Sequence, residues 1–125
     1  MKVLFIGGTG IISSACSELA IEKGMDLYHL NRGQSKNKRP IEGVKHLYAD
    51  IRKPETVKEA IKDHNFDCVV DWIAFIPEHI RTDIKLFKGK TSQYLFISSA
   101  SAYQTPAVSL PITEKTPLEN PFWQY

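Results

Sequence analysis

A short apolar run that breaks into a glycine-rich turn constrains the fold of this chain more than any other feature. Residues 3–6 are continuously apolar, which suits a strand buried on both faces of a sheet. Gly7-Gly8-Thr9-Gly10 follows directly, and residues 11–23 then repeat apolar or small side chains at the spacing of one helical face. That expected face consists of Ile11, Ile12, Ala15, Cys16, Leu19 and Ala20. The turn therefore joins a buried strand directly to a helix, which Gly24 terminates.

Beyond this unit the chain continues to alternate between expected strands and helices, which predicts a parallel sheet with crossover helices. Pro54 and Pro77 each suit the first turn of a helix, where the missing N–H of proline costs nothing. The expected strands are residues 26–30, 44–48, 67–75 and 93–97, and the expected helices are residues 54–63 and 77–87. We therefore expect an α/β fold, a Rossmann-like doubly wound parallel sheet in three α/β/α layers, truncated after about five strands.

Composition and charge exclude several classes of protein. The 125 residues amount to one domain, and 16 basic against 14 acidic side chains leave a net charge of +2. That charge implies neither nucleic acid nor a membrane surface as a partner, and no apolar run approaches the roughly 20 residues of a membrane-spanning helix. Two cysteines are too few for a disulfide framework, and the four histidines fall on separate elements. We expect a cytoplasmic protein without a metal site.

The last part of the chain has a different character. Four of the seven prolines lie within residues 99–125, which favours an irregular surface segment. The sequence then ends on Phe122-Trp123-Gln124-Tyr125, an aromatic cluster whose exposure to water is costly. We therefore expect residues 1–125 to be the N-terminal fragment of a longer protein.

Glycine at the turn has a chemical use as well as a structural one. It permits positive φ and lets a ligand approach the backbone without a Cβ in the way. The helix that starts at Ile11 directs unpaired N–H groups at the same space, and a diphosphate suits that geometry best. No Lys-Ser/Thr pair follows, so the turn is not a P-loop, and Ser13 stands where a third glycine is usual. We expect dinucleotide binding by Gly7, Gly10, Ile11 and Ile12; the alternative is a tight turn with no ligand.

The end of the next strand indicates which dinucleotide is bound. Asn31 occupies the position where an acidic residue would bind the ribose 2′-OH of NAD, and Arg32 follows it. With no carboxylate there, and a guanidinium able to bind a phosphate through two hydrogen bonds, this position slightly favours NADP over NAD. Further basic residues nearby are Lys36, Lys38 and Arg39. The alternative is a solvated basic loop over residues 31–43, since runs of charge are usually surface.

Asp50-Ile51, just after the third expected strand, is the candidate adenine contact. Asp50 would accept a hydrogen bond from the adenine amino group. The alternative is that Asp50 only places negative charge ahead of the helix that begins at Pro54.

Taken in order, the motifs of this chain resemble those of a known family. The motifs are Gly7-Gly8-Thr9-Gly10, Asp50-Ile51, Val70-Asp71-Trp72-Ile73-Ala74 and Phe96-Ile97-Ser98-Ser99-Ala100-Ser101-Ala102-Tyr103. The set is similar to the extended short-chain dehydrogenase/reductases and, within them, to the NAD-dependent epimerase/dehydratase family of nucleotide-sugar enzymes. The resemblance implies NAD or NADP as cofactor, with Ile73 and Ala74 beside it. It also implies a small-molecule substrate like a nucleotide sugar, a substrate domain that this chain lacks, and a homodimer for the full-length protein.

The resemblance implies the catalytic residues as well. The family has a Ser or Thr at the end of the fifth strand, then a Tyr, and a Lys four residues after the Tyr. The serine matches Ser99 and the tyrosine matches Tyr125, so the lysine would come after the end of this sequence. Ser99 would orient the substrate oxygen, and the tyrosine would exchange a proton while the cofactor transfers hydride.

Alternatives remain open for these residues. Ser98 and Ser99 are alternatively strand-end hydroxyls that satisfy the backbone, and Tyr125 is alternatively an ordinary half-buried aromatic. Tyr103 is rejected as the acid/base because position 107 is an alanine. A different class of function, a non-catalytic dinucleotide-sensing or RNA-binding relative of the same fold, is the alternative to an oxidoreductase, epimerase or dehydratase.

Two positions depart from the family pattern. Ser13 is small enough for close packing of helix on strand, so cofactor binding is still expected. Asp71-Trp72 replaces the more usual histidine or asparagine followed by a small residue, which leaves the shape of the nicotinamide pocket open. Asp67 and Asp71 flank one expected strand at opposite ends, which argues against a paired-carboxylate site.

We predict that residues 1–125 alone are catalytically inert, because they contain no lysine four residues after Tyr125 to favour its phenolate. Incubation of the purified chain with either dinucleotide and a panel of sugar nucleotides, followed by chromatography of the sugars, should show no conversion. Measurable turnover of any sugar nucleotide would contradict this.

Overall fold

The structure, a computed structural model that describes residues 1–34 and 40–122, is built on one sheet of five parallel strands. The strands are β1 (Lys2–Ile6), β2 (Asp26–Asn31), β3 (Lys45–Tyr48), β4 (Phe66–Asp71) and β5 (Thr91–Phe96). The helices are α1 (Ile11–Glu22), α2 (Pro54–Ala60), α3 (Pro77–Phe87) and a short 3-10 turn at Ala100–Ala102. The strand order β3-β2-β1-β4-β5 reverses between β1 and β4, which confirms the doubly wound Rossmann-like fold.

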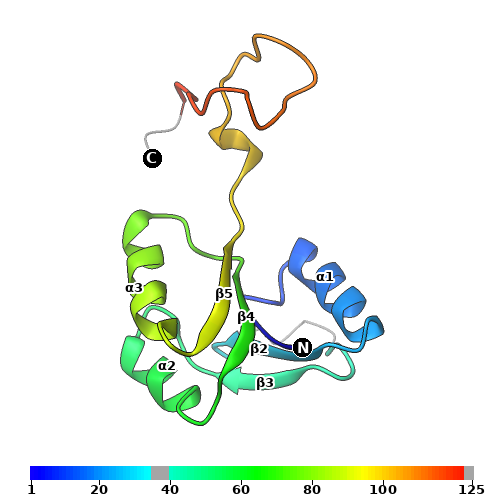
Figure 1. Ribbon diagram of the computed structural model, residues 1–125, viewed down its shortest axis with the longest axis vertical. Coiled ribbons are helices and arrows are strands. Elements are labelled where there is room, and N and C mark those ends of the chain that lie inside the picture. The colour runs from blue at the N-terminus through cyan, green and yellow to red at the C-terminus, as the bar shows by residue number, and fades with distance from the viewer. Residues whose placement is uncertain (35–39, 123–125) are drawn as a thin grey trace.

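Helices cover both faces of the sheet, with α1 on one side and α2 and α3 on the other (Figure 1). Alternate residues of β1 serve the two faces, as the period of a strand requires. Val3 and Phe5 pack in the cluster beneath α1, and Leu4 and Ile6 pack in the cluster beneath α2 and α3. The apolar run that begins the chain is therefore the centre of both cores. None of the helices in the described parts of the chain is long and apolar enough to span a membrane.

The prolines and Gly24 mark element boundaries as the sequence predicts. Pro54 begins α2 and Pro77 begins α3, each within the first turn. Gly24 has a φ of +71° just past the end of α1, and its N–H donates to the carbonyl of Ile21 at 2.9 Å. These boundaries depend on the local chemistry of single residues, so the sequence alone locates them.

The prediction for α1 is wrong about which face is buried. Ile11 and Ile12 are 94% and 69% exposed, and Leu19 is also exposed. Ala20 of the predicted face is buried, and the other buried residues of the helix, Ser13 and Ser17, lie outside that face. Small side chains at this spacing let α1 lie close to the sheet, so its larger apolar residues are left on the outside.

The strand predicted over 67–75 is also too long, because β4 ends at Asp71. Oδ1 of Asp71 accepts hydrogen bonds from the N–H groups of Ile73 at 2.7 Å and Ala74 at 3.1 Å. A side chain that accepts from the backbone N–H groups two and three residues further on turns the chain out of the sheet, although the sequence there stays apolar. Residues 72–76 are therefore a loop that leads to α3.

The helix predicted over 54–63 ends at Ala60, and a lysine from the loop before β5 binds carbonyls of the residues that follow. Nζ of Lys90 donates to the carbonyls of Ile61, Lys62 and His64 at 3.0, 2.9 and 3.3 Å. Lys90 lies 26 to 29 residues further along the chain. Nothing local in the sequence signals this end of the helix.

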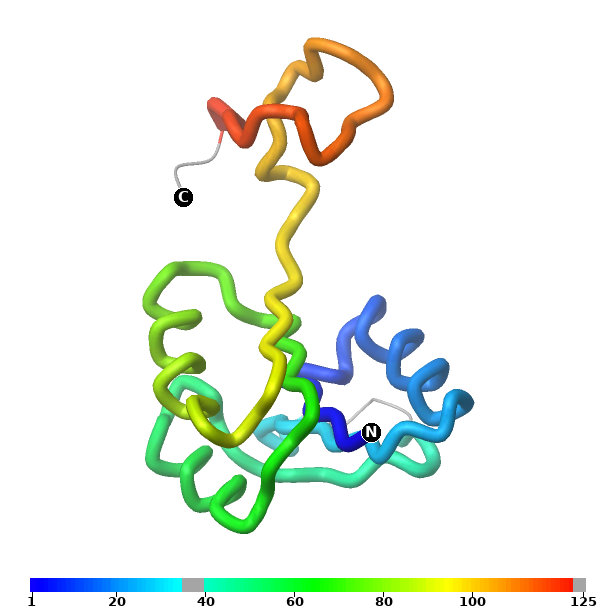
Figure 2. The backbone as a smooth tube through the Cα atoms, viewed as in Figure 1, coloured from blue at the N-terminus to red at the C-terminus, as the bar shows by residue number. Residues whose placement is uncertain are grey.

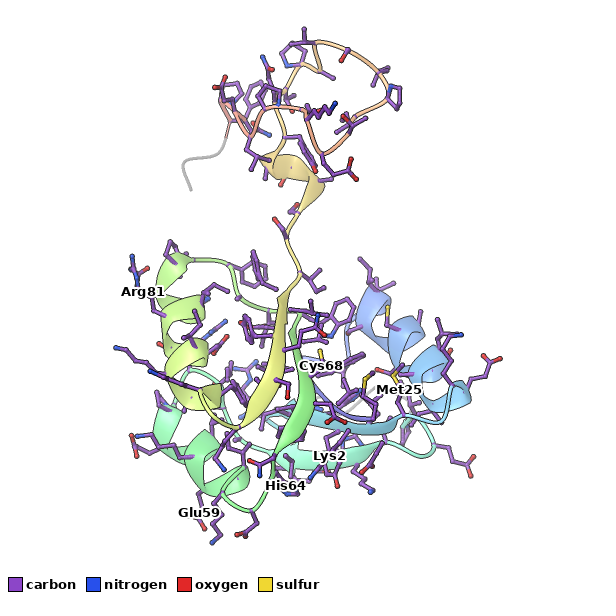
Figure 3. The ribbon with its side chains drawn as sticks, viewed as in Figure 1. Lys2, Met25, Glu59, His64, Cys68 and Arg81 are labelled. Carbon is purple, nitrogen blue, oxygen red and sulfur yellow. The ribbon has the colours of Figure 1, made fainter. Side chains whose placement is uncertain are left out.

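At the amino ends of the strands, the ammonium group of Lys2 lies among aromatic side chains. Nζ of Lys2 lies 3.1 Å from Nδ1 of His64, and the two residues lie together at that end in Figure 3. The same ammonium lies about 5 Å from the ring centres of Tyr28 and Phe66 (5.0 and 5.1 Å). The amino edge of the sheet is thus occupied by side chains.

The segment after β5 stands apart from the sheet (Figure 2). Within this segment, the N–H of Gln104 donates to the carbonyl of Pro117 at 2.8 Å. Nδ2 of Asn120 donates to the carbonyl of Ser101 at 2.6 Å. Through residue 122 this part has no strand or α-helix, which confirms the irregular segment predicted from its prolines.

The polar side chains beneath α1 form a buried network around His29. Nε2 of His29 lies 2.8 Å from Oγ of Ser17, whose hydroxyl donates to the carbonyl of Ser13 at 2.7 Å. Burial, followed by the charge of nearby His46, lowers the pKa of His29 from its usual 6.5 to about 4. The imidazole is therefore neutral at pH 7 and costs free energy to protonate.

We predict that the chain loses stability as the pH falls from about 6.5 to 4, by at most about 3 kcal/mol from this histidine. The sign follows because the unfolded chain binds the proton first in that range. His29→Gln should flatten this part of the curve of unfolding free energy against pH, measured by urea denaturation. His46→Gln, on an exposed neighbour, should leave most of the acid loss in place. A wild-type slope that His29→Gln leaves unchanged would refute the assignment.

Candidate functional site

The candidate site lies at the carboxyl ends of β1 and β4, where the strand order reverses. From β1 the chain turns toward α1 on one face, and from β4 it turns toward α3 on the other (Figure 1). Loops that diverge in this way leave a crevice at the edge of the sheet, and ligands of doubly wound folds bind there.

The glycine turn fits tightly against the loop that follows β4. Gly7 has a φ of +81°, which favours glycine, and its N–H donates to the carbonyl of Leu30 at 3.2 Å. A Cβ on Gly7 would lie 2.5 Å from Cγ2 of Ile73. Gly7 therefore allows the turn after β1 and the loop after β4 to touch.

Gly8 and Ser13 fix the inner side of the turn. A Cβ on Gly8 would lie 2.5 Å from Nε2 of the buried His29 ring. Oγ of Ser13 accepts from the N–H of Gly10 at 2.8 Å and has the carbonyls of Gly7 and Gly10 within 3.1 and 3.3 Å as acceptors. The prediction that Ser13 packs closely in place of a glycine is confirmed, and its hydroxyl also ties the turn together.

The start of α1 presents donors to the crevice. In residues 1–34 and 40–122, no acceptor is found for the N–H groups of Ile11 and Ile12, which are the first two of the helix. The first turn of α1 contains no acidic residue. Gly7 and Gly10 use their own N–H groups within the protein, whereas Ile11 and Ile12 offer donors to an anion at the start of the helix.

Asn31 and Arg32 lie at the carboxyl end of β2, beside the glycine turn. Asn31 is half-buried, and its carbonyl accepts from the N–H of Ala49 at 3.1 Å. Arg32 is exposed and free to reach a ligand. The nearby basic residues Lys36, Lys38 and Arg39 lie outside the described residues.

The two predicted adenine contacts differ in their surroundings. Oδ1 of Asp50 accepts from the N–H of Arg52 at 3.0 Å, and its carbonyl accepts from the N–H of Lys53 at 2.8 Å, so Asp50 organises the turn ahead of α2. Ile51 is buried in the main core. The side chain of Ile51 therefore packs in the core, and contact of Asp50-Ile51 with adenine stays a prediction.

Ile73 and Ala74 are held in the loop after β4 by side chains from two directions. The carboxylate of Asp71 accepts both of their N–H groups. Nη2 of Arg52 donates to the carbonyl of Ile73 at 2.6 Å. The indole N–H of Trp72 is buried and, in the described part of the chain, has no acceptor. The backbone of Ile73, which lies next to the glycine turn, is thus held at both its N–H group and its carbonyl.

Sequence reasoning missed the partner of Asp71. That carboxylate meets Asp83 of α3 and Tyr94 of β5, and both acids are fully buried. Comparing Asp71 with Asp67 led to the expectation that no paired carboxylates exist, which is wrong. The available signal was Asp83 itself, an acid at helical spacing from Ile80 and Phe87 on a face that otherwise reads as apolar.

Of the two predicted catalytic residues, the structure describes only Ser99, which is not brought to the glycine turn. Ser99 is exposed on the segment that stands apart from the sheet (Figure 2). Its Oγ accepts from the N–H of Ser101 at 3.2 Å and lies 2.8 Å from the hydroxyl of Ser101. This is the backbone-satisfying role weighed as the alternative for Ser99. Tyr125 lies outside the described residues.

The residues at this edge fit the diphosphate of a dinucleotide. A turn without Cβ atoms, two free N–H donors at a helix start and no nearby acid in the first turn suit an anion. Within the described residues no group of three or more His, Cys, Asp or Glu side chains has the spacing of a metal site.

Comparison with known proteins gives a consistent set of relatives. The model of the NAD-dependent epimerase/dehydratase family matches residues 3–91. A UDP-glucose 4-epimerase of Lactobacillus helveticus is 30% identical, and the match covers 100% of this chain and 43% of that protein. This chain thus spans less than half the length of that relative.

Solved structures share the fold. A UDP-glucose 4-epimerase from Bifidobacterium longum, crystallised with NAD+ and UDP, has a TM-score of 0.79 and 24% identity over 98% of this chain and 44% of its own. The UDP-Glc/GlcNAc 4-epimerase of Campylobacter jejuni has a TM-score of 0.77 and 18% identity over 94% of this chain and 43% of its own. Together with the family match over the glycine turn and the first four strands, these findings show that the chain belongs to the NAD-dependent epimerase/dehydratase family.

Proposed function

We propose that this chain is the dinucleotide-binding part of an NAD(P)-dependent enzyme that acts on a nucleotide sugar, most closely an epimerase. The observation that carries the proposal is the glycine turn at the reversal of strand order, where the unpartnered N–H groups of Ile11 and Ile12 face the sheet edge. The substrate class comes from the names of the relatives. The proposal also includes dehydration and reduction as the other reactions of such an enzyme.

Each site residue has a proposed task. The donors of Ile11 and Ile12 bind the diphosphate, while Gly7 and Gly10 let it approach the backbone. The other contacts are Asn31 and Arg32 at the adenosine ribose, Asp50 and the backbone of Ile51 at adenine, and Ile73 and Ala74 at the opposite side of the crevice. Oδ1 of Asp50 is already engaged, so its second oxygen is the acceptor proposed for the adenine amino group.

The chemistry belongs to the bound cofactor, which accepts and returns a hydride. Ser99 is proposed to hold the substrate oxygen, exchanging its bond with Ser101 for one with substrate. Tyr125 is proposed as the group that takes and returns a proton. Both tasks require the segment after β5 to lie over the carboxyl edge of the sheet in the active enzyme.

We also propose a domain division, a cellular location and an oligomeric state for the full-length enzyme. Residues 1–125 form the Rossmann part of the enzyme, and the substrate-binding part lies in the further length that the relatives have. The two cysteines, Cys16 and Cys68, are free thiols, which suits a cytoplasmic location. A homodimer is proposed for the full-length enzyme.

We predict that NADH binds the chain saturably, with a Kd below about 1 mM, and that Gly7→Ala weakens this binding at least about tenfold. The added methyl group meets Ile73 and moves the loop that forms the crevice. The measurement is energy transfer from tryptophan emission to the bound reduced nicotinamide, with circular dichroism to confirm folding.

Gly24→Ala is the matched control, because Gly24 has a similar φ but no atom within 4 Å of an added Cβ. Both variants should lose about 1 kcal/mol of stability from backbone strain, Gly7→Ala should lose more through its contact with Ile73, and only Gly7→Ala should lose affinity. Equal affinity for the two variants would contradict the site. Salt-dependent binding of RNA together with no binding of NADH would favour the non-catalytic alternative.

We predict a second effect at the ribose position. Arg32→Gln should weaken NADPH binding about tenfold and leave NADH binding within about twofold, because only NADPH offers a phosphate to the guanidinium. The same titration measures both ligands. If wild-type chain binds NADH as tightly as NADPH and Arg32→Gln changes neither, the preference for NADP is wrong.

A further inference from the structure

Three buried polar groups from three elements meet behind the loop that follows β4. Asp71 ends β4, Asp83 lies in the middle of α3 and Tyr94 lies on β5. The hydroxyl of Tyr94 is 3.3 Å from Oδ2 of Asp71 and 3.0 Å from Oδ2 of Asp83. Both carboxyl groups have a solvent exposure of 0%. Water therefore has no access to balance their charges.

The cluster needs one more proton than the hydroxyl group of Tyr94 supplies. Tyr94 has one hydrogen, and two carboxyl oxygens lie within reach of it. The second oxygen of Asp83, Oδ1, is buried without a donor from any described residue. Two ionised carboxylates in one dry site repel each other strongly, so one further proton belongs to the pair. A proton on Asp83 lets that side chain donate to Asp71.

Asp71 connects the cluster to the loop after β4, because its other oxygen accepts two hydrogen bonds. Oδ1 receives the N–H groups of Ile73 and Ala74 at 2.7 and 3.1 Å, and a carboxylate accepts such bonds better than a neutral acid. Ile73 in turn touches Gly7, where an added Cβ would lie 2.5 Å from its Cγ2. A continuous series of contacts thus runs from Asp83 to the glycine turn.

We propose that Asp83 is a positioning residue, protonated at neutral pH, whose hydrogen bond to Asp71 holds residues 72–74 against the glycine turn and so sets the affinity for the dinucleotide. This proposal rests on the proposed function only where it concerns the affinity for the dinucleotide. Asp83 touches no ligand, and it acts through Asp71 and the backbone of the loop.

The surroundings of Asp83 agree with a bound proton. The titratable and charged groups that face it are Asp71 from β4, Tyr94 from β5 and Arg52 from the loop before α2. Burial first, then the hydrogen bond to Asp71 and the charge of Asp71, raise the pKa of Asp83 from 3.8 to about 8, against the opposing effects of Tyr94 and Arg52. Burial and the two acids also raise the pKa of Tyr94, so the phenol keeps its hydrogen.

Asp83→Asn is the informative variant, because the amide can donate to Asp71 and accept from Tyr94 without titrating. Between pH 4 and 8 the folded wild-type chain keeps a proton that the unfolded chain releases, so this group loses stability as the pH rises through that window. The melting temperature of Asp83→Asn minus that of wild type should therefore rise from pH 5 to 8 and level off above. Subtracting the curves removes the effect of His29, which both proteins share.

Binding tests the positioning step. Wild-type affinity for NADH should fall about fivefold or more between pH 7 and 9.5, as Asp83 ionises and repels Asp71. Asp83→Asn should keep its affinity across that range, and Asp83→Ala should bind weakly at every pH. Asp63→Asn, an exposed acid after α2, is the matched control and should follow wild type in both measurements.

A ligand-free readout separates this proposal from the proposed function. In a Trp123→Phe background, emission from Trp72 reports on the loop itself, and it should change with a midpoint near pH 8 in wild type but not in Asp83→Asn. A melting-temperature difference that stays flat from pH 5 to 9, or a Trp72 transition that persists in Asp83→Asn, overturns the proposal. An affinity that is independent of pH in wild type overturns the positioning step. Absence of NADH binding at every pH, with the Trp72 transition present, contradicts the proposed function instead.

Discussion

The candidate site depends on one constraint, the parallel pairing of β1 with β2 on one side and with β4 on the other. β1 sits in the middle of the sheet, and its residues alternate between the two cores. Because the chain turns to opposite faces after β1 and after β4, the ends of these two strands lie at the position where doubly wound folds bind their ligands. The close contact of Gly7 with Ile73 then sets how near the two loops come. A larger residue at position 7 would separate them.

Much of this arrangement is readable from the sequence because it depends on local chemistry. The apolar run of residues 3–6, the glycine turn and Pro54 and Pro77 each carry their structural meaning within a few residues. The alternation of strands with helices then allows very few topologies, and the observed order is one of them. The fold was therefore predictable, and so was the position of the glycine turn at the carboxyl edge of the sheet.

The features that sequence reasoning missed depend on contacts between distant residues. The buried face of α1 is decided by what fits against β2, where His29 needs the hydroxyl of Ser17 and space over Gly8. The end of β4 is decided by the hydrogen bonds of Asp71, which override an apolar sequence. The pairing of Asp71 with Asp83 joins a strand to a helix 12 residues later, and no spacing rule within one element detects it. The relation of Ser99 to Tyr125 remains a prediction, since the latter is outside the part of the chain described.

The most direct test of the central claim is a map of backbone amide shifts in 15N-labelled chain titrated with NADH. The account predicts the largest changes at the amides of Ile11 and Ile12, with smaller ones at Gly7 and Ile73, because a diphosphate accepts hydrogen bonds from the start of α1. Saturable changes confined to other edges of the sheet, with the amides of Ile11 and Ile12 unmoved, would contradict it.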